Sequence, residues 1–160
     1  MRSELFHPLS VHFLISLVVL FFGLKIFAYF VRKEEQKNYL KKFNFVVLTL
    51  SLVSVFISIY LGDMAFEVVR SNLCQIGKVD QHEELSKLLA LTLFVTLTIE
   101  TLVLVFESKI KDRNIYKLKE IFTLLLSIVA LVFLFQTSHS GAMLVYEQGA
   151  GVLNHTKSCQ

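Results

Sequence analysis

Apolar residues fill four long runs of this chain, and polar residues gather between them. The runs extend over residues 5–31, 43–66, 85–106 and 115–135. Each is long enough to cross a hydrocarbon layer of about 30 Å as a helix that rises about 1.5 Å per residue. The runs are apolar on every side and lack the alternation of a membrane β-strand. The pattern predicts an all-α fold, a four-helix transmembrane bundle in a single domain over residues 1–160.

The composition favours a membrane protein over a soluble one. Hydrophobic residues make up 54% of the chain and charged residues only 18%, which is more apolar than is usual for a soluble domain. The first run is too long for a cleaved signal peptide, and its polar His7, Pro8 and His12 come too early. The net charge of +3 comes mainly from basic clusters between the runs, which indicates topology rather than nucleic-acid binding.

These basic clusters predict the orientation of the chain. Residues 32–42 and 107–120 are both rich in lysine and arginine. The positive-inside rule places both segments in the cytoplasm, so the two termini and the segment between the second and third spans lie on the outer face. We expect residues 138–160 to form an outer tail, too short to span again, that folds back onto this face.

Polar and small residues inside the spans predict contacts between helices. Lys25 and Glu100 lie at a similar depth, about 10 Å from the cytoplasmic ends of the first and third spans. Because charges in a bilayer usually face a partner, the two are predicted to pair, although Lys25 alone could instead extend to the surface. Ser54, Ser58 and Gly62 recur at every fourth position of the second span and predict close helix packing.

The histidines are the main candidates for chemistry, and all five fall at the predicted outer face: His7, His12, His82, His139 and His155. Imidazole binds haem iron and divalent metals well, and helical bundles build such sites from inward-facing side chains. We expect haem b in an apolar slot between these residues. A divalent-metal site is one alternative, and histidines that only hydrogen-bond loop backbone are another.

The spacing of the histidines separates their predicted roles. His7 and His12 lie about 140° apart around a helix and do not bind the same iron. His12, which is deeper, is the predicted axial ligand, with His82 or His139 opposite it. His7 is expected to support the site by hydrogen bonding.

The predicted outer segments hold further features. Cys74 and Cys159 share the outer compartment, where a disulfide between them would tie the tail to the second loop. Gly141, Gly149 and Gly151 would let backbone pass close to a planar ligand, or would simply allow close packing.

Three stretches resemble the domain of unknown function family 2231, which comprises small four-helix predicted bacterial membrane proteins. They are His7-Pro8-Leu9-Ser10-Val11-His12-Phe13, His82, and residues 139–152, which follow the pattern HxGxxLVYxxGxGV. The resemblance covers nearly the whole chain and implies a place in the bacterial inner membrane, with periplasmic termini. Relatives joined to Rieske or c-type cytochrome modules imply electron transfer. Ala142 replaces a usual glycine, and Gln148 stands where a histidine often precedes the glycine, so one haem is implied rather than two.

Together these features predict a membrane b-type cytochrome-like electron-transfer subunit that binds haem through histidines near the outer face. A quinol or a periplasmic redox carrier is the expected partner. The alternatives are a non-catalytic accessory or assembly subunit of a larger membrane complex, and a divalent-metal-binding membrane protein. The sequence contains no catalytic triad or phosphate-binding loop, so an electron-transfer or accessory subunit is favoured over a stand-alone enzyme.

Overall fold

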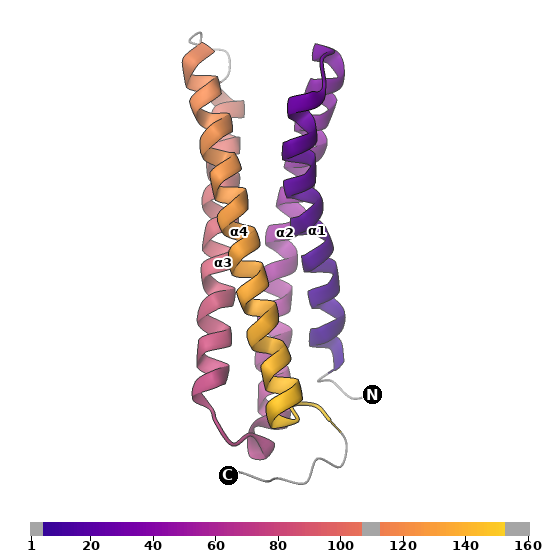
Figure 1. Ribbon diagram of the computed structural model, residues 1–160, viewed down its shortest axis with the longest axis vertical. Coiled ribbons are helices and arrows are strands. Elements are labelled where there is room, and N and C mark those ends of the chain that lie inside the picture. The colour runs from indigo at the N-terminus through magenta and orange to yellow at the C-terminus, as the bar shows by residue number, and fades with distance from the viewer. Residues whose placement is uncertain (1–4, 107–112, 153–160) are drawn as a thin grey trace.

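The four predicted helices are all present in the computed structural model, which describes residues 5–106 and 113–152 (Figure 1). Within these residues there are no strands. The helices are α1 (Phe6–Phe30), α2 (Glu34–Val69), α3 (Gly77–Phe106) and α4 (Arg113–Gln148), and a short 3-10 helix, η2 (Arg70–Asn72), follows α2. The predicted all-α fold is therefore confirmed.

The surface of the bundle requires a membrane. Each helix contains a stretch with a mean hydropathy of 2.3, and only 22–28% of each stretch is buried inside the protein. The remaining apolar side chains face outward along the whole bundle, where only lipid can cover them without a large free-energy cost. The four helices are thus long and apolar enough to be membrane spans, while the direction in which they cross stays a prediction.

The two helical hairpins, α1 with α2 and α3 with α4, are built on the same plan (Figure 1). Helix contacts are most extensive within each hairpin. The buried positions of α1 recur in α3 after 75 residues, a shift that matches His7 to His82 and Lys25 to Glu100. A second constant shift relates α2 to α4. Matching buried pairs are Leu14 and Leu89, Val18 and Leu93, Phe21 and Thr96, Leu48 and Ser127, and Val55 and Leu134. The chain is therefore a tandem repeat of one hairpin, a plan that places shared sites between the repeats.

The two ends of the bundle differ in how closely the hairpins approach. We call the end that contains His7 and His82 the histidine end, and the end that contains Lys25 and Glu100 the charged end. The hairpins lie together at the histidine end, at the bottom of Figure 1, and diverge toward the charged end at the top. The termini of the described chain lie at the histidine end, as predicted for two ends on one face.

The fourth helix is longer than the apolar run predicted. It continues from Phe135 to Gln148, so the expectation that residues 138–148 leave the helix and fold back is wrong. The helix ends at Gly149, whose φ of 66° suits glycine, with backbone bonds from Gly149 to Val145 and from Ala150 to Leu144. Gly149 and Gly151 therefore shape the end of a helix. A helix can outlast its apolar run because its backbone bonds do not depend on hydropathy.

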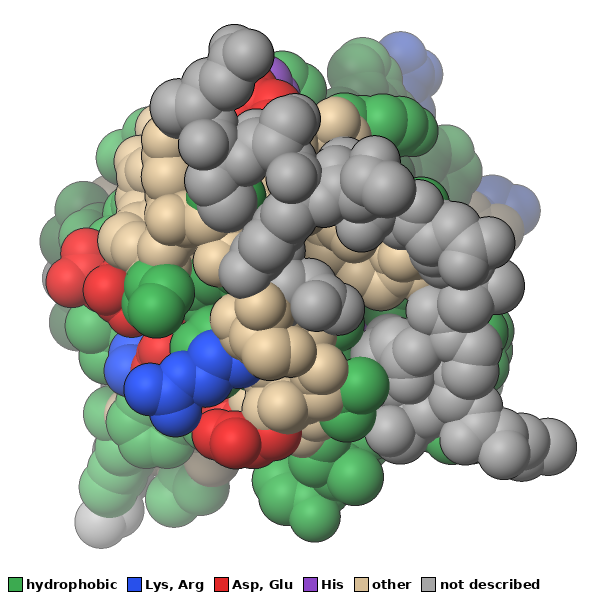
Figure 2. Space-filling view, turned by 90° about the horizontal axis from the view of Figure 1, so that it is seen from below, with side chains coloured by type: hydrophobic (Ala, Val, Ile, Leu, Met, Phe, Trp, Pro, Cys, Tyr) green, Lys and Arg blue, Asp and Glu red, His purple; other side chains and the backbone are tan. Residues whose placement is uncertain are grey.

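Contacts at the end of α4 tie it to the segment before α3. Gln148 is buried, and its Oε1 accepts a hydrogen bond of 3.0 Å from the backbone N–H of Gln75. Lys78 forms an ion pair with Glu147, and basic and acidic side chains lie side by side on this face (Figure 2). Gln148 thus has a structural role at the end of α4.

The structure describes one of the two cysteines of the predicted disulfide. Cys74 is disulfide-bonded. Its predicted partner Cys159 lies outside the described residues, as do His155 and residues 107–112.

Candidate functional site

His7 of α1 and His82 of α3 lie next to each other at the histidine end. Their ring centroids are 6.2 Å apart, and the ring planes form an angle of 87° in an edge arrangement. Both side chains are half-buried between the helices. Since the two residues hold equivalent positions in the repeat, each hairpin contributes one imidazole to the same place. This pair is the candidate functional site.

The hydrogen bonds of both rings leave their Nε2 atoms with a lone pair. Nδ1 of His7 lies 2.9 Å from the carbonyl oxygen of Ser58, which can only accept, so Nδ1 carries the hydrogen. Nδ1 of His82 lies 2.9 Å from Oγ of Ser140. That hydroxyl donates its own hydrogen to the carbonyl of Thr137, so it accepts from His82. In the neutral rings both Nε2 atoms are therefore free to bind a metal or a proton.

Each ring packs against a glycine on the other helix of its hairpin. A Cβ added to Gly62 would lie 3.2 Å from Cε1 of His7, and a Cβ added to Gly141 would lie 3.0 Å from Cε1 of His82. Both distances are shorter than ordinary van der Waals contact, so these rings come this close only because the residues are glycines. The predicted close packing at Ser58 and Gly62 is confirmed, since Ser58 is buried against α1 and its hydroxyl donates to that of Ser10.

A further polar atom beside the pair lacks a partner. The side-chain oxygen of Thr137 is buried and makes no hydrogen bond within the described part of the chain. The backbone of the same residue interacts with His82. Buried polar atoms are normally satisfied, so among the described residues this hydroxyl lacks a partner that such groups usually have.

The other histidines lie away from this pair. His12 is exposed on α1, with its Nδ1 2.6 Å from the carbonyl oxygen of Pro8 in the same helix. His139 is within α4 rather than after it, and is also exposed. Among the described residues, the structure brings His7, rather than His12 or His139, into ring contact with His82. His155 lies outside the described residues.

The face of α1 explains why His7 and not His12 meets another helix. The buried residues of α1 are Leu14, Val18, Phe21 and Lys25. His7 lies five helical turns before Lys25 at about 3.6 residues per turn, and therefore on the same face, while His12 does not. Depth in the membrane alone favoured His12 as the ligand. The periodicity that runs from His7 to Lys25 is the signal that identifies the face of α1 that meets the other helices.

The charged end holds a second polar cluster, formed by Lys25, Glu100, Lys119 and Glu120. Lys25 is only 6% exposed and forms an ion pair with Glu100, which confirms the predicted contact between α1 and α3. Lys119 of α4 reaches Glu100 at 2.7 Å and Glu120 at 2.9 Å. Lys25 also donates a hydrogen bond of 2.9 Å to Oγ1 of Thr123. The four charges sum to zero, which lowers the cost of burying them.

Two members of this cluster were not predicted from the sequence. Lys119 and Glu120 fall where the fourth run (115–135) and the basic segment 107–120 overlap, and they were counted in the cytoplasmic segment, whereas the structure has them inside α4. Lys119 is 10% exposed. One signal in the sequence did point to further partners. A carboxylate can accept, and an ammonium group can donate, more hydrogen bonds than the single pair of Glu100 and Lys25 uses.

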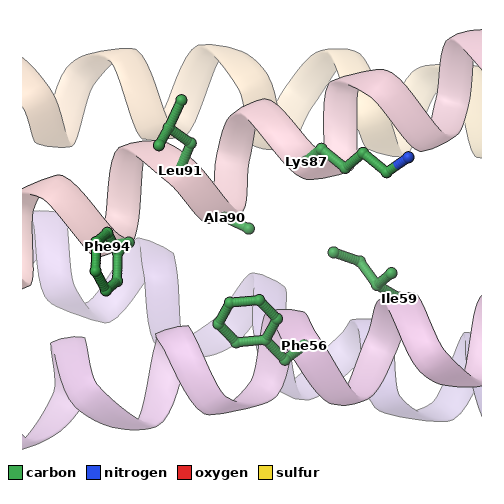
Figure 3. A pocket seen from close by; sticks show the side chains of 6 residues that line it. All are labelled: Phe56, Ile59, Lys87, Ala90, Leu91 and Phe94. Carbon is green, nitrogen blue, oxygen red and sulfur yellow. The ribbon is translucent and has the colours of Figure 1, made fainter.

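One hollow of the described bundle contains the charged cluster, and another is lined by residues of neither cluster. A cavity of about 980 Å³ opens at the charged end between the hairpins and contains the four-charge cluster in its wall. A smaller groove of about 300 Å³ lies between α2 and α3, where Phe56 and Ile59 face Ala90 and Phe94 (Figure 3). The groove is apolar apart from Lys87 at its margin, which is paired with Glu83. Lipid chains would fill such a groove, so it suggests no chemistry.

Within the described residues, no three histidine, cysteine, aspartate or glutamate side chains are grouped to hold a metal ion. The nitrogen pair of His7 and His82 is therefore the metal-binding candidate that the described chain offers. Two imidazoles can serve as ligands of haem iron, whose other four ligands come from the porphyrin.

A family model described as predicted membrane protein (DUF2231) matches residues 4–154. No curated protein and no solved structure matches the chain.

Proposed function

The chain belongs to this family of predicted membrane proteins, DUF2231, and we propose that it transfers electrons through one b-type haem held by His7 and His82. The observation that carries the proposal is the meeting of two imidazoles from separate hairpins, each with its Nδ1 hydrogen already used. Nδ1 bound to a protein oxygen and Nε2 left open is the usual state of a metal-ligating histidine.

The separation of the rings is compatible with this role. Their centroids lie 6.2 Å apart, close enough that both rings could hold one metal ion at nitrogen–metal distances of about 2 Å. Imidazole binds through a lone pair in its own plane, so the angle between the two ring planes is not restricted.

The protein's own groups would orient the ligands and tune them. Haem supplies one-electron chemistry when bound. The carbonyl of Ser58 and the hydroxyl of Ser140 hold the Nδ1 hydrogens of the two rings and fix which nitrogen faces the site. Gly62 and Gly141 let the rings sit against the helix backbone. The apolar bundle around the pair would lower the local dielectric constant and limit the access of water.

The position of the pair in the bundle suggests which electron-transfer partner could reach it. The two residues lie near the end of their helices, where the described termini also lie. With the basic segments in the cytoplasm, this end faces the periplasm of the bacterial inner membrane. A quinol in the bilayer or a periplasmic redox carrier could then reach the site from the membrane surface.

An absorbance spectrum of the purified protein tests the proposal. Protein expressed with sufficient haem should show a Soret band and, after dithionite reduction, the α-band of a six-coordinate b-type haem. His7→Ala and His82→Ala should each abolish that spectrum, while the matched controls His12→Ala and His139→Ala should retain it. Absence of a Soret band, or its loss in the control variants, contradicts the proposed ligands.

The same purified sample separates the remaining candidates. Elemental analysis that finds a divalent metal at one ion per chain, lost in His7→Ala and His82→Ala, would establish the metal-binding alternative. A sample that contains neither haem nor metal, but co-purifies with a larger complex, would establish an accessory subunit.

A further inference from the structure

We propose that the cavity at the charged end binds a phosphate ester that also carries hydroxyl groups, such as the headgroup of an anionic glycerophospholipid or a free polyol phosphate. The cavity lies between the hairpins, has a volume of about 980 Å³, and draws its wall from all four helices. Its position is distinct from that of the histidine pair, so this inference does not depend on haem binding.

The charge of the cavity wall favours an anion. Lysines in the wall outnumber glutamates by six to three. Lys25 and Lys119 are already neutralised within the four-charge cluster, and Lys37 pairs with Glu34 at 4.0 Å. The excess charge therefore comes from the remaining three lysines of the wall, which are Lys41, Lys42 and Lys117.

These three lysines have no ion-pair partner within 4.0 Å among the described residues. Lys41 and Lys42 come from α2 and Lys117 comes from α4, so they flank the cavity from both hairpins. Basic pockets between transmembrane helices near the cytoplasmic surface bind anionic lipid headgroups. A phosphate between the hairpins could accept charge-assisted hydrogen bonds from both sides.

Asn44 indicates that the ligand is more than a bare anion. It lies in the cavity wall, is 8% exposed, and its Oδ1 makes no hydrogen bond within the described chain. A buried amide oxygen accepts hydrogen and costs free energy when left alone. A phosphodiester has no hydrogen to donate, whereas a glycerol or other polyol has hydroxyl groups. A ligand with both groups would satisfy the lysines and Asn44 together.

The two hairpins differ at this position in a way that suits a ligand. Thr123 is the residue of α4 that matches Asn44 of α2, and its hydroxyl is bonded to Lys25. At this position the first hairpin therefore has an acceptor without a hydrogen bond among the described residues, the Asn44 oxygen, whereas the equivalent Thr123 oxygen of the second hairpin already accepts one.

The test is a thermal unfolding titration of the full-length protein in a neutral detergent at fixed ionic strength. The three probes are short-chain phosphatidylglycerol, short-chain phosphatidylcholine and sn-glycerol 3-phosphate. We expect phosphatidylglycerol to raise the unfolding temperature in a saturable way and phosphatidylcholine to do so at least about tenfold more weakly, because its headgroup has no net charge and no hydroxyl. Saturation by sn-glycerol 3-phosphate as well would identify a soluble phosphate ester as a ligand, and its failure would identify the lipid.

Matched variants remove the same charge inside and outside the cavity. Lys41→Gln with Lys117→Gln should weaken phosphatidylglycerol binding at least about tenfold. Arg32→Gln with Lys33→Gln removes the same charge at the same end from residues that do not line the cavity, and should weaken binding by less than about threefold. Equal losses in the two double variants, or no saturable response to either phosphate probe, would overturn the proposal.

Asn44→Leu separates a ligand contact from a structural one. It should weaken phosphatidylglycerol binding about threefold to tenfold while leaving the ligand-free protein at least as resistant to heat, since an unsatisfied buried group is removed. A ligand-free protein that loses heat resistance, with unchanged binding, would show that Asn44 is structural and would remove the hydroxyl requirement from the proposal.

Discussion

The two hairpins agree at one end of the bundle and differ at the other. At the histidine end, His7 and Gly62 in the first hairpin match His82 and Gly141 in the second. At the charged end, Lys25 of the first hairpin matches Glu100 of the second. Lys41 likewise matches Glu120 through the shift that relates α2 to α4. One duplicated plan thus has identical groups at one end and opposite charges at the other.

This difference indicates separate tasks for the two ends. Two imidazoles that come to one place from separate hairpins can both bind a single guest, so their recurrence in the two halves favours a common guest. Opposite charges attract directly and need no guest, so they favour attachment of one hairpin to the other. The histidine end is therefore the place to look for a cofactor, and the four-charge cluster is the place to look for stability.

The largest effect should come from breaking the attachment. Among the described residues, Lys25→Met leaves Glu100 and Glu120 with Lys119 as their remaining ion-pair partner, and Glu100 stays largely buried with an incompletely compensated charge. We expect a loss of about 3–5 kcal/mol in the free energy of unfolding, which is typical when one partner of a buried pair is removed. Unfolding in mixed detergent and SDS micelles would measure it.

Removing the charges as a pair should restore most of that loss. Lys25→Met combined with Glu100→Gln leaves Lys119 and Glu120 to neutralise each other, so we expect unfolding within about 1–2 kcal/mol of the natural protein. Lys87→Met, which removes an exposed lysine paired within α3, is the control and should have little effect. A double variant as unstable as the single one would mean that helix packing at Lys25, rather than charge, holds the hairpins.

The fold and this ion pair could be read from the sequence, because both depend on hydropathy and on the cost of an intramembrane charge. The four apolar runs predicted the four helices, and the similar depth of Lys25 and Glu100 predicted the contact between α1 and α3. The site was harder, because it depends on which face of α1 meets α3. The correspondence between α1 and α3, in which His7 is equivalent to His82, is visible in the buried positions of the two helices. The correspondence is hard to see in the sequence because most equivalent residues differ in type, as Phe21 and Thr96 do.

Helix length could not be predicted from hydropathy either, because two helices are longer than their apolar runs. Apolar runs mark where lipid surrounds a helix, and α2 and α4 both extend well beyond theirs. The extension of α4 places Ser140 opposite His82. Lys119 lies inside the fourth run but was counted in the basic cytoplasmic segment, and it joins the charged cluster from within the helix. Both contacts involve polar residues that the prediction assigned to segments outside the membrane.

A smaller effect should test the agreement of the hairpins at the histidine end. Gly62→Ala and Gly141→Ala each place a methyl group against a ring that is held by a hydrogen bond. We expect each to cost about 1–3 kcal/mol of unfolding free energy, the range for overpacking, with Gly141→Ala the more severe because its contact is closer. Thermal unfolding in detergent would measure both.

Gly23→Ala is the control for this pair of variants, since a Cβ there meets nothing within 4 Å. It should be neutral or stabilise the helix by up to about 1 kcal/mol, because alanine favours helix more than glycine does. If Gly62→Ala and Gly141→Ala behave like Gly23→Ala, the rings can move away freely and the histidine end is not a preformed site.

The smallest effect should reveal where the two histidines differ. His7 donates to a backbone carbonyl, which no substitution of Ser58 removes, whereas His82 donates to the side chain of Ser140. Ser140→Ala should therefore cost about 0.5–1.5 kcal/mol and shift the ring ¹⁵N resonances of His82, while Ser58→Ala should leave those of His7 in place. Unmoved His82 resonances in Ser140→Ala would mean that the backbone of Thr137, which also interacts with this ring, is its true acceptor. Both halves would then hold their imidazoles by backbone alone, and the agreement between the hairpins at this end would be complete.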